Sequence, residues 1–497
     1  MKRPSDVTFQ PYTGTTPRTD AGHVAADEPF RLLLLGDLSG RASRGVVEPL
    51  ADRRPRRIDR DDLQATLADA ELDLPTRLEG HRLRLSIRSL EDLHPDALWD
   101  RVDVFEELRS LRRRLSDPHT FAEAARELRG SSSPTPETKP AAAPEPFADG
   151  GALEAALAET VAAGDRRATT LVDAILRDLV VPRIPATPGQ AELIESVDHA
   201  AAEEMRTLLT TPSLRRLEST WRAIEMLLRR SETDGKLQLW VFDVTPEELV
   251  RDLVDHSEPR DCELWRALFE RDDAQDGPRW AAWCPLELTF GGGAKQAGLL
   301  ARIARLSAAA STSMLAAASE EVAGCASIAA APDPDDWAAL SPEAESAWTA
   351  LRHLPEASWI LLALPRLLLR APYGARTQPT EHFRFEELRD PPDHEDFLWG
   401  TGALAPLIVL AREFASKGWS LTPEGRFEVD RLTAPVVETD GEARVQPCAE
   451  ALLSERTGER LRSLGITPLS TVRDSDRVRV GPLRSLAGAP LAGRWSS

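Results

Sequence analysis

Two glycine-rich segments are the first places in this sequence where chemistry could be sought. Residues 291–295 read Gly-Gly-Gly-Ala-Lys, a composition typical of loops whose backbone N–H groups and lysine hold phosphate. Such a loop also needs a Ser or Thr hydroxyl after the lysine to hold Mg²⁺, and Gln296 stands there instead. We therefore interpret the three glycines as a turn before a helix.

The segment Gly36-Asp37-Leu38-Ser39-Gly40 places a serine between two glycines. A nucleophile elbow needs the serine midway between its glycines, so that a strained turn exposes the hydroxyl. Here the serine touches the second glycine directly. We expect a turn after a strand, in which Asp37 and Ser39 bond the local backbone.

Histidines and carboxylates offer a second kind of chemistry. His382 and Glu386 stand four positions apart, as two metal ligands on one helix face would, and residues 393–395 add Asp, His and Glu. A Pro-Pro pair interrupts this segment, and no His-Glu-x-x-His pattern is present. Other carboxylates lie at expected helix starts, where they interact favourably with the helix dipole, namely Asp59, Asp61, Asp62, Glu91 and Asp92. We predict no catalytic residue, metal site or cofactor.

The composition limits the classes of partner. The chain has 497 residues, a formal net charge of −20, 42% hydrophobic and 29% charged residues, which is typical of a soluble globular protein with two or three domains. So acidic a surface repels nucleic acid. A local basic cluster is more often a solvated or subunit-pairing face than a nucleic-acid site, and its members are Arg41, Arg44, Arg53, Arg54, Arg56, Arg57 and Arg60.

Cysteine spacing and hydropathy indicate the compartment. Four cysteines occur with no Cys-x-x-Cys pair, which favours free thiols in a reducing compartment. The first twenty residues lack the apolar core of a secretory signal. The most apolar stretch, residues 359–369, is too short to span a bilayer. We expect a cytoplasmic protein without membrane insertion.

The elements that must position any site fall into two regions. After a flexible arm over residues 1–30, an apolar run at 31–36 predicts a buried strand, and 60–71 a helix. Alternation of apolar and polar residues over 83–87 predicts a second strand, and Val104, Leu108, Leu111 and Leu115 mark an amphipathic helix. Residues 31–130 therefore form a small α/β unit.

A linker separates this unit from the second region. Residues 131–150 begin SSSPTPETKPAAAPEP, a proline-rich and semi-extended composition, and 151–187 return to helical periodicity as a connector. From 188 to 497 we expect a second α/β unit. Its predicted helices cover 191–230, with a break at Pro212, 294–310 and 397–414, and its predicted strands cover 237–243, 280–290, 357–364 and 478–480.

Apolar, aromatic and arginine-bearing motifs stand out more than any reactive group. Leu217 and Trp221 share one face of the helix after Pro212. Arg366 and Arg370 come at the end of a buried strand, where arginine usually pairs with a carboxylate, and Glu386 and Glu387 are natural candidates.

These motifs resemble the large sheath subunit of type VI secretion systems. Residues 217–222 are similar to its L-E-x-x-W-R-G helix, with Ala223 in place of glycine, and 364–374 to its P-R-f-L-l-R-x-P-Y-G segment. The F-x-F-E-E, W-G, F-x-x-x-G-W and L-G-F-x-P-L stretches follow in order to Leu469. The matching positions are Leu217, Glu218, Trp221, Arg222, Pro365, Arg366, Arg370, Pro372, Tyr373, Gly374, Phe385, Glu386, Glu387, Trp399, Gly400, Gly418 and Trp419.

The first unit resembles the small sheath subunit. Residues 34–40 are similar to its strand and D-l-S-G turn, 53–63 to R-k-f-v-x-I-D-R-D-N-F, and 90–96 to a helix start. Asp62, Leu63 and Leu93 depart from the usual Asn, Phe and Phe, but keep polarity or apolarity. The matching positions are Asp37, Ser39, Gly40, Asp59, Arg60, Asp61, Asp92 and Pro95.

The resemblance implies a natural fusion of both subunits. The implied fold is mixed α/β, two α/β units forming a core in which helices flank a mixed sheet. The implied function is a structural part of the contractile sheath, polymerising with itself by strand exchange around an inner-tube protein, attached to a baseplate and recycled by an AAA+ unfoldase. A non-polymerising adaptor or regulator that binds sheath or baseplate is the alternative. The sequence leaves open whether the two regions pair within one chain or between chains.

Overall fold

The computed structural model describes residues 24–25, 27–46, 48–70, 72–78, 81–130, 189–270, 279–439 and 442–496. Most of the expected N-terminal arm, the proline-rich linker and the helical connector lie outside the described residues.

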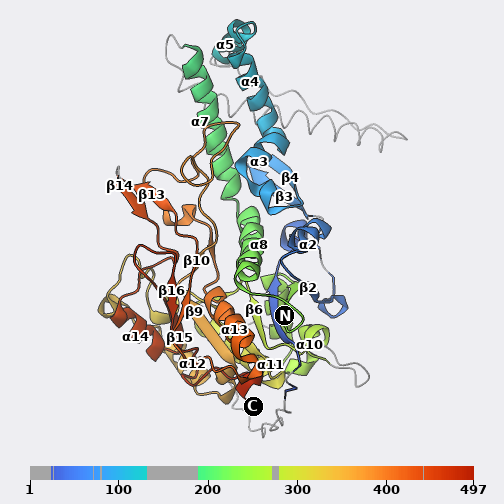
Figure 1. Ribbon diagram of the computed structural model, residues 1–497, viewed down its shortest axis with the longest axis vertical. Coiled ribbons are helices and arrows are strands. Elements are labelled where there is room, and N and C mark those ends of the chain that lie inside the picture. The colour runs from blue at the N-terminus through green and yellow to red at the C-terminus, as the bar shows by residue number, and fades with distance from the viewer. Residues whose placement is uncertain are drawn as a thin grey trace, which may run out of the picture.

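One large mixed sheet of ten strands organises the body of the protein (Figure 1). Its strand order is β12-β16-β15-β9-β8-β6-β1-β5-β2, and β7 pairs with β8 off this path. The strands, in chain order, are β1 Phe30–Gly36, β2 Arg56–Ile58, β5 Leu237–Asp243, β6 Ala282–Pro285, β7 Thr289–Phe290, β8 Ser313–Ala318, β9 Ile360–Leu364, β12 Phe427–Val429, β15 Ile466–Thr471 and β16 Val478–Val480.

The centre of this sheet is parallel and buried on both faces. Strands β5, β1, β6, β8, β9 and β15 run parallel, whereas β2, β16 and β12 pair antiparallel at the edges. In β1, Leu32 and Leu34 enter one core, while Leu33 and Leu35 enter the other. A continuous apolar run is what such a strand requires, because both of its faces are covered.

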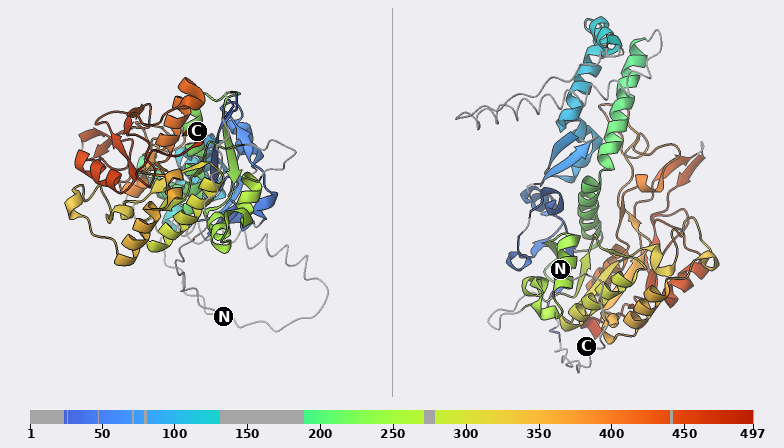
Figure 2. Two further views of the ribbon diagram at one scale, coloured as in Figure 1. Left: turned by 90° about the horizontal axis from the view of Figure 1, so that it is seen from below. Right: turned by 180° about the vertical axis from the view of Figure 1, so that it is seen from behind.

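Helices cover the two faces of the sheet. Side chains of α8 and α13 pack in the first core, and those of α9, α10, α11, α12 and α14 in the second. Figure 1 shows α13 in front of the sheet, and the right view of Figure 2 shows α11 and α12 in front after a half turn. These helices are α8 Pro212–Arg230, α9 Pro246–Asp255, α10 Glu263–Leu268, α11 Ala294–Ala309, α12 Pro342–Arg352, α13 Leu404–Lys417 and α14 Glu455–Ser463.

A helical rod projects from one end of the body (Figure 1). Its long helices α4 and α7 lie side by side, and Arg112 of α4 donates to Asp198 of α7 at 2.5 Å. Below it lie the hairpin β3–β4 and short helices of the N-terminal region. The elements of this part are α1 Arg41–Arg44, α2 Leu63–Asp69, β3 Leu72–Leu78, β4 His81–Ile87, α3 Pro95–Arg101, α4 Glu106–Ser116, α5 Phe121–Gly130 and α7 Gln190–Leu209.

Two small antiparallel pairs lie outside the large sheet. They are β10 Leu367–Leu368 with β11 Trp399–Gly400, and β13 Val436–Thr439 with β14 Glu442–Val445.

Most expected elements are present, three predictions need correction, and one strand was not predicted. The strand expected over 280–290 is two strands, β6 and β7, separated by a turn. The helix expected over 397–414 begins only at Leu404, because 399–400 pair as β11. The strand expected from 357 starts at Ile360, after a short 3-10 helix. Strand β3 was not predicted, because Pro75 lies in its interior, where proline is uncommon in strands.

The two sequence regions share the large sheet. Strand β1 of the first region lies between β5 and β6 of the second, and β2 extends the same sheet beyond β5. Phe30 also stacks on Phe414 with ring centroids 4.5 Å apart and lies 5.2 Å from Trp419. The regions therefore pair within one chain in this structure, and the expected α/β class with a mixed sheet between helices is confirmed.

Candidate functional site

A buried ion-pair network lies where the second region's motifs meet, and we call it the Arg370 junction: Glu218, Arg370, Tyr373 and Glu387. Arg370 follows β10, Glu218 is on α8, and Glu387 comes from the loop before β11. Arg370 Nε donates to Glu218 Oε1 at 2.6 Å, and Nη1 and Nη2 donate to the two oxygens of Glu387 at 2.7 and 2.8 Å. Arginine's planar fork suits this paired geometry.

The surroundings of the Arg370 junction stabilise the charged form of Arg370. Burial lowers the pKa of Arg370, but the charges of Glu218 and Glu387 outweigh it and hold the pKa well above the ordinary value. The Tyr373 ring lies 4.0 Å from the guanidinium carbon, a cation–π contact. Arg222 Nε lies 3.6 Å from Glu218, but its Nη1 lies closer to Glu225, at 3.0 Å.

The sequence prediction of arginine partners is confirmed for one pair. Glu387 binds Arg370, as expected. Glu386 binds neither arginine and accepts instead from the Ala375 backbone N–H at 3.1 Å. A Cβ added to Gly374 would meet Glu386 Oε2 at 2.2 Å, so this position lies close against the loop.

Arg366 has its own carboxylates, which the sequence did not reveal. Its Nη2 lies 2.6 Å from Glu450 and 2.9 Å from Glu395. Burial raises the pKa of Glu450, but His394 and Arg366 outweigh it and lower the pKa to about 2. His394 Nε2 lies 2.8 Å from Glu450, and this bond raises the pKa of His394. We call these four residues the Arg366 cluster.

The histidines whose spacing could have indicated a metal site bind other side chains. His394 pairs with Glu450 and also stacks on Trp399 at 5.2 Å, while Glu395 pairs with Arg366, so both side chains already have partners. His382 lies apart from them, with Nε2 at 3.3 Å from Asp100 of α3.

The turn after β1 leads into α1 and is hydrogen-bonded to the end of β5. Both oxygens of Asp37 accept backbone N–H groups of α1, from Arg41 at 2.6 Å and Ala42 at 3.0 Å, as the sequence predicted. Ser39 differs from the prediction, because its hydroxyl donates to Asp243 Oδ2 at 2.7 Å and not to the local backbone. Gly40 has φ +68°, the left-handed conformation that glycine adopts without strain.

The remaining first-region motif residues form turns and caps. Asp59 Oδ1 accepts the N–H groups of Asp61 and Asp62 before α2. Arg60 donates to the carbonyl of Leu228 at 3.2 Å near the end of α8, where a cation suits the helix dipole.

Asp92 and Pro95 start the next helical turns. Asp92 Oδ2 accepts the N–H of Arg88 at 2.7 Å and of Ser89 at 3.0 Å, while its other oxygen pairs with Arg101. Pro95 is the first residue of α3, where its missing N–H costs no hydrogen bond.

Aromatic motif residues tie the two regions together. Trp221 is buried and donates from Nε1 to the carbonyl of Leu38 at 3.0 Å. Trp99 of α3 stacks on Phe383 at 4.7 Å, and Phe383 lies against Phe385 at 5.6 Å.

The other motif positions serve local packing. Trp419 donates to Glu28, and Gly418 ends α13 with φ +60°. A Cβ on Gly400 would meet Leu369 at 2.6 Å. Leu217, Pro365 and Pro372 are buried.

The glycine triplet is confirmed as a turn before α11. A Cβ on Gly292 would meet the Glu321 carbonyl oxygen at 2.3 Å, and Trp348 Nε1 donates to the Gly292 carbonyl at 2.9 Å. Close packing therefore accounts for Gly291 and Gly292, whereas a Cβ on Gly293 would meet nothing within 4 Å.

A surface groove of about 550 Å³ runs between the first region and α8. Leucine side chains form the floor of the groove, and both acidic and basic side chains line its rim. The lining residues are Arg60, Asp61, Leu63, Gln64, Leu67, Leu90, Glu91, Glu225, Leu228 and Arg229. Two motif residues, Arg60 and Asp61, are exposed here.

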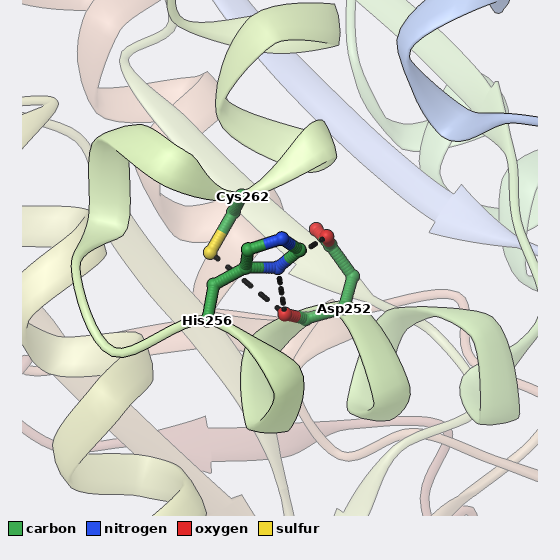
Figure 3. A group of neighbouring side chains, drawn as sticks. All are labelled: Asp252, His256 and Cys262. Carbon is green, nitrogen blue, oxygen red and sulfur yellow. Dashed lines mark hydrogen bonds and ion pairs between the residues drawn. The ribbon is translucent and has the colours of Figure 1, made fainter.

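Asp252, His256 and Cys262 form a compact polar group that a metal could use (Figure 3). Both oxygens of Asp252 already accept backbone N–H groups at the start of α10, from Glu263 and Leu264 at 2.9 Å. His256 Nδ1 lies 2.9 Å from the Asp252 carbonyl oxygen, and burial raises the pKa of Cys262 to about 11. A protonated thiol and a capping carboxylate fit a helix cap better than a metal centre.

Comparison with known families agrees with this motif set. The family model described as "EvpB/VC_A0108, tail sheath N-terminal domain" matches residues 191–486. The chain belongs to this tail-sheath family. A second model, "Type VI secretion system, VipA, VC_A0107 or Hcp2", matches residues 16–131. The order of the two matches is that of the expected fusion.

One curated relative is similar to this sheath-family chain. The type VI secretion system sheath protein TssC1 of Pseudomonas aeruginosa is 28% identical over 291 residues, which are 57% of this chain and 58% of the relative. The alignment thus spans a little over half the relative's length. The family is one of structural sheath proteins, and among the described residues no helix is long and apolar enough to cross a membrane.

Proposed function

We propose that this chain is a structural subunit of the contractile sheath of a type VI secretion system, which polymerises around an inner tube and contracts to propel it. The observation that carries the proposal is the shared sheet, in which β1 of the small-subunit-like region lies between β5 and β6 of the large-subunit-like region. One polypeptide thereby supplies a paired building block.

Contraction requires no bond chemistry in the subunit. A sheath can store free energy at assembly and release it in a transition between two packings of the same subunits. The buried ion pairs of the Arg370 junction suit a subunit that moves as a rigid body, because they fix α8 against two loops. The proposed partners are further copies of the chain, an inner-tube protein, a baseplate and an AAA+ unfoldase.

Two features support self-association. The groove between α2 and α8 presents exposed charged motif residues around an apolar floor. The hairpin β13–β14 is largely exposed, with Val436 at 47% exposure, and a free strand edge of this kind can accept a strand from a neighbour.

Electron microscopy of the purified full chain, alone and with an inner-tube protein, tests the proposal. We expect rings or tubes. Glu91→Lys, which reverses a charge on the groove, should abolish them while leaving the monomer folded. Glu459→Lys, an exposed change on α14, is the matched control and should assemble normally. Monomers under all conditions would contradict the proposal that the chain polymerises. Binding of such monomers to a preformed sheath would favour the alternative, a non-polymerising adaptor.

A further inference from the structure

Glu287 is a buried carboxyl where the two regions meet, and it is not one of the motif positions described above. Glu287 lies in the turn between β6 and β7, with its side chain 7% exposed. Its Oε1 accepts the backbone N–H of Asp37, at the end of β1, at 2.7 Å. The same oxygen accepts the hydroxyl of Thr220, on α8, at 2.8 Å. One oxygen atom therefore joins the N-terminal strand to α8.

The second oxygen of Glu287 is buried without a hydrogen-bond partner among the described residues. The nearest cation is Arg216 Nε at 3.9 Å. That guanidinium also lies 3.7 Å from the exposed carboxylate of Glu247 on α9, so it stands between two acids. A cavity of about 10 Å³ lies beside Glu287, which is about the space of one water molecule.

Burial of Glu287 favours its neutral form. Burial raises the pKa of Glu287 to about 7, although the bonds from Asp37 and Thr220 and the charge of Arg216 act in the opposite direction. The carboxylate of Asp37 adds to the rise. Other charged groups around this joint are Asp243 at the end of β5 and, on α9, Glu248, which pairs with Arg53 and lies 4.0 Å from Arg41.

We propose that Glu287 is a proton-sensitive latch between the N-terminal strand and α8, closed when the carboxyl is neutral and weakened when it ionises. The ionised form places a charge on an oxygen that has no donor. It must draw Arg216 away from Glu247 or admit water beside Gly36. Gly36 packs so closely that a Cβ would meet Thr220 at 2.8 Å, so a movement of Glu287 towards that cation or water disturbs the contact between the end of β1 and α8.

The contribution of Glu287 to stability decreases as the pH rises. A carboxyl whose pKa is higher in the folded than in the unfolded state binds its proton preferentially when folded. Its stabilising contribution is complete below about pH 4.5 and is lost as the pH rises through about 7. The corresponding change in the unfolding equilibrium constant is on the order of 100-fold.

Denaturant unfolding of the full chain between about pH 5 and pH 8.5 tests the proposal. We expect the unfolding midpoint of the wild type to fall over this range relative to Glu287→Gln. Glu247→Gln and Asp37→Asn should retain the fall. Equal pH dependence in wild type and Glu287→Gln, or its loss in Asp37→Asn alone, would overturn the proposal.

Two further measurements keep the test decisive if Glu287→Gln does not fold. Arg216→Met removes the opposing cation and should move the fall to higher pH, whereas an unchanged position contradicts the latch. Infrared titration of the wild type should show one neutral carboxyl that persists to about pH 7. Complete ionisation of all carboxyls by about pH 6 would refute the inference.

Discussion

Arg370 Nε and Glu218 Oε1 lie 2.6 Å apart, although 152 positions separate the two residues in the chain. The pair fastens the segment after β10 to α8, and Glu387 holds the other side of the same guanidinium. Because all three side chains are less than 10% exposed, each charge depends on the others for compensation.

Arg370→Met should destabilise the protein by about 3–5 kcal/mol, because it leaves two buried carboxylates without their cation. Chemical denaturation of the purified chain measures the change. Arg376→Met is the matched control, since Arg376 is 61% exposed in its pair with Glu438 and should cost less than about 1 kcal/mol. Similar losses in both variants would contradict the account of the Arg370 junction.

Gly292→Ala should destabilise by about 1–3 kcal/mol, since the new Cβ would overlap the Glu321 carbonyl oxygen. Gly298→Ala, inside α11, has open space around it and should stabilise by up to about 1 kcal/mol. Thermal unfolding of both variants checks the pair. A neutral Gly292→Ala would show that the turn before α11 adjusts freely.

The sequence predicted local features well and long-range partners poorly. The buried strand β1 and the amphipathic helix α4 follow from local pattern, and both are present. Glu218 and Glu450 could not be assigned to Arg370 and Arg366, because helices, strands and loops far apart in the sequence bring them together.

The position of β1 between β5 and β6 could likewise not be predicted from the sequence. The central strands are mostly apolar, so their periodicity carries no information on which strands are neighbours. The same holds for Glu287, whose raised pKa depends on three elements that meet only in the folded chain.

The Arg366 cluster predicts that the free energy of unfolding decreases at acid pH. The pKa of Glu450 is lowered to about 2, so its contribution is present above about pH 4.5 and is lost as the pH falls towards 2. The pKa of His394 is raised, so its smaller contribution is present below about pH 6.5 and is lost as the pH rises through the raised value.

Glu450→Gln should therefore weaken the decrease of the unfolding free energy at acid pH. It should also lower that free energy by on the order of 2–3 kcal/mol at pH 6. Denaturant unfolding midpoints between about pH 2.5 and pH 7 measure it. Glu442→Gln, which alters an exposed pair with Arg444, should leave the decrease at acid pH unchanged. An unaltered decrease in Glu450→Gln would show that other carboxylates dominate acid unfolding.

The shared sheet predicts what happens when the chain is cut between its two regions. A specific protease site inserted within residues 131–150 divides the polypeptide without touching β1 or its neighbours. Because β1 pairs with both β5 and β6 and its leucines enter both cores, the two fragments should stay together during size-exclusion chromatography and separate only in denaturant. Leu34→Arg in the cut chain should release them, since a charge would then enter the first core. Fragments that separate without denaturant would contradict the shared sheet as a stable contact between the two regions.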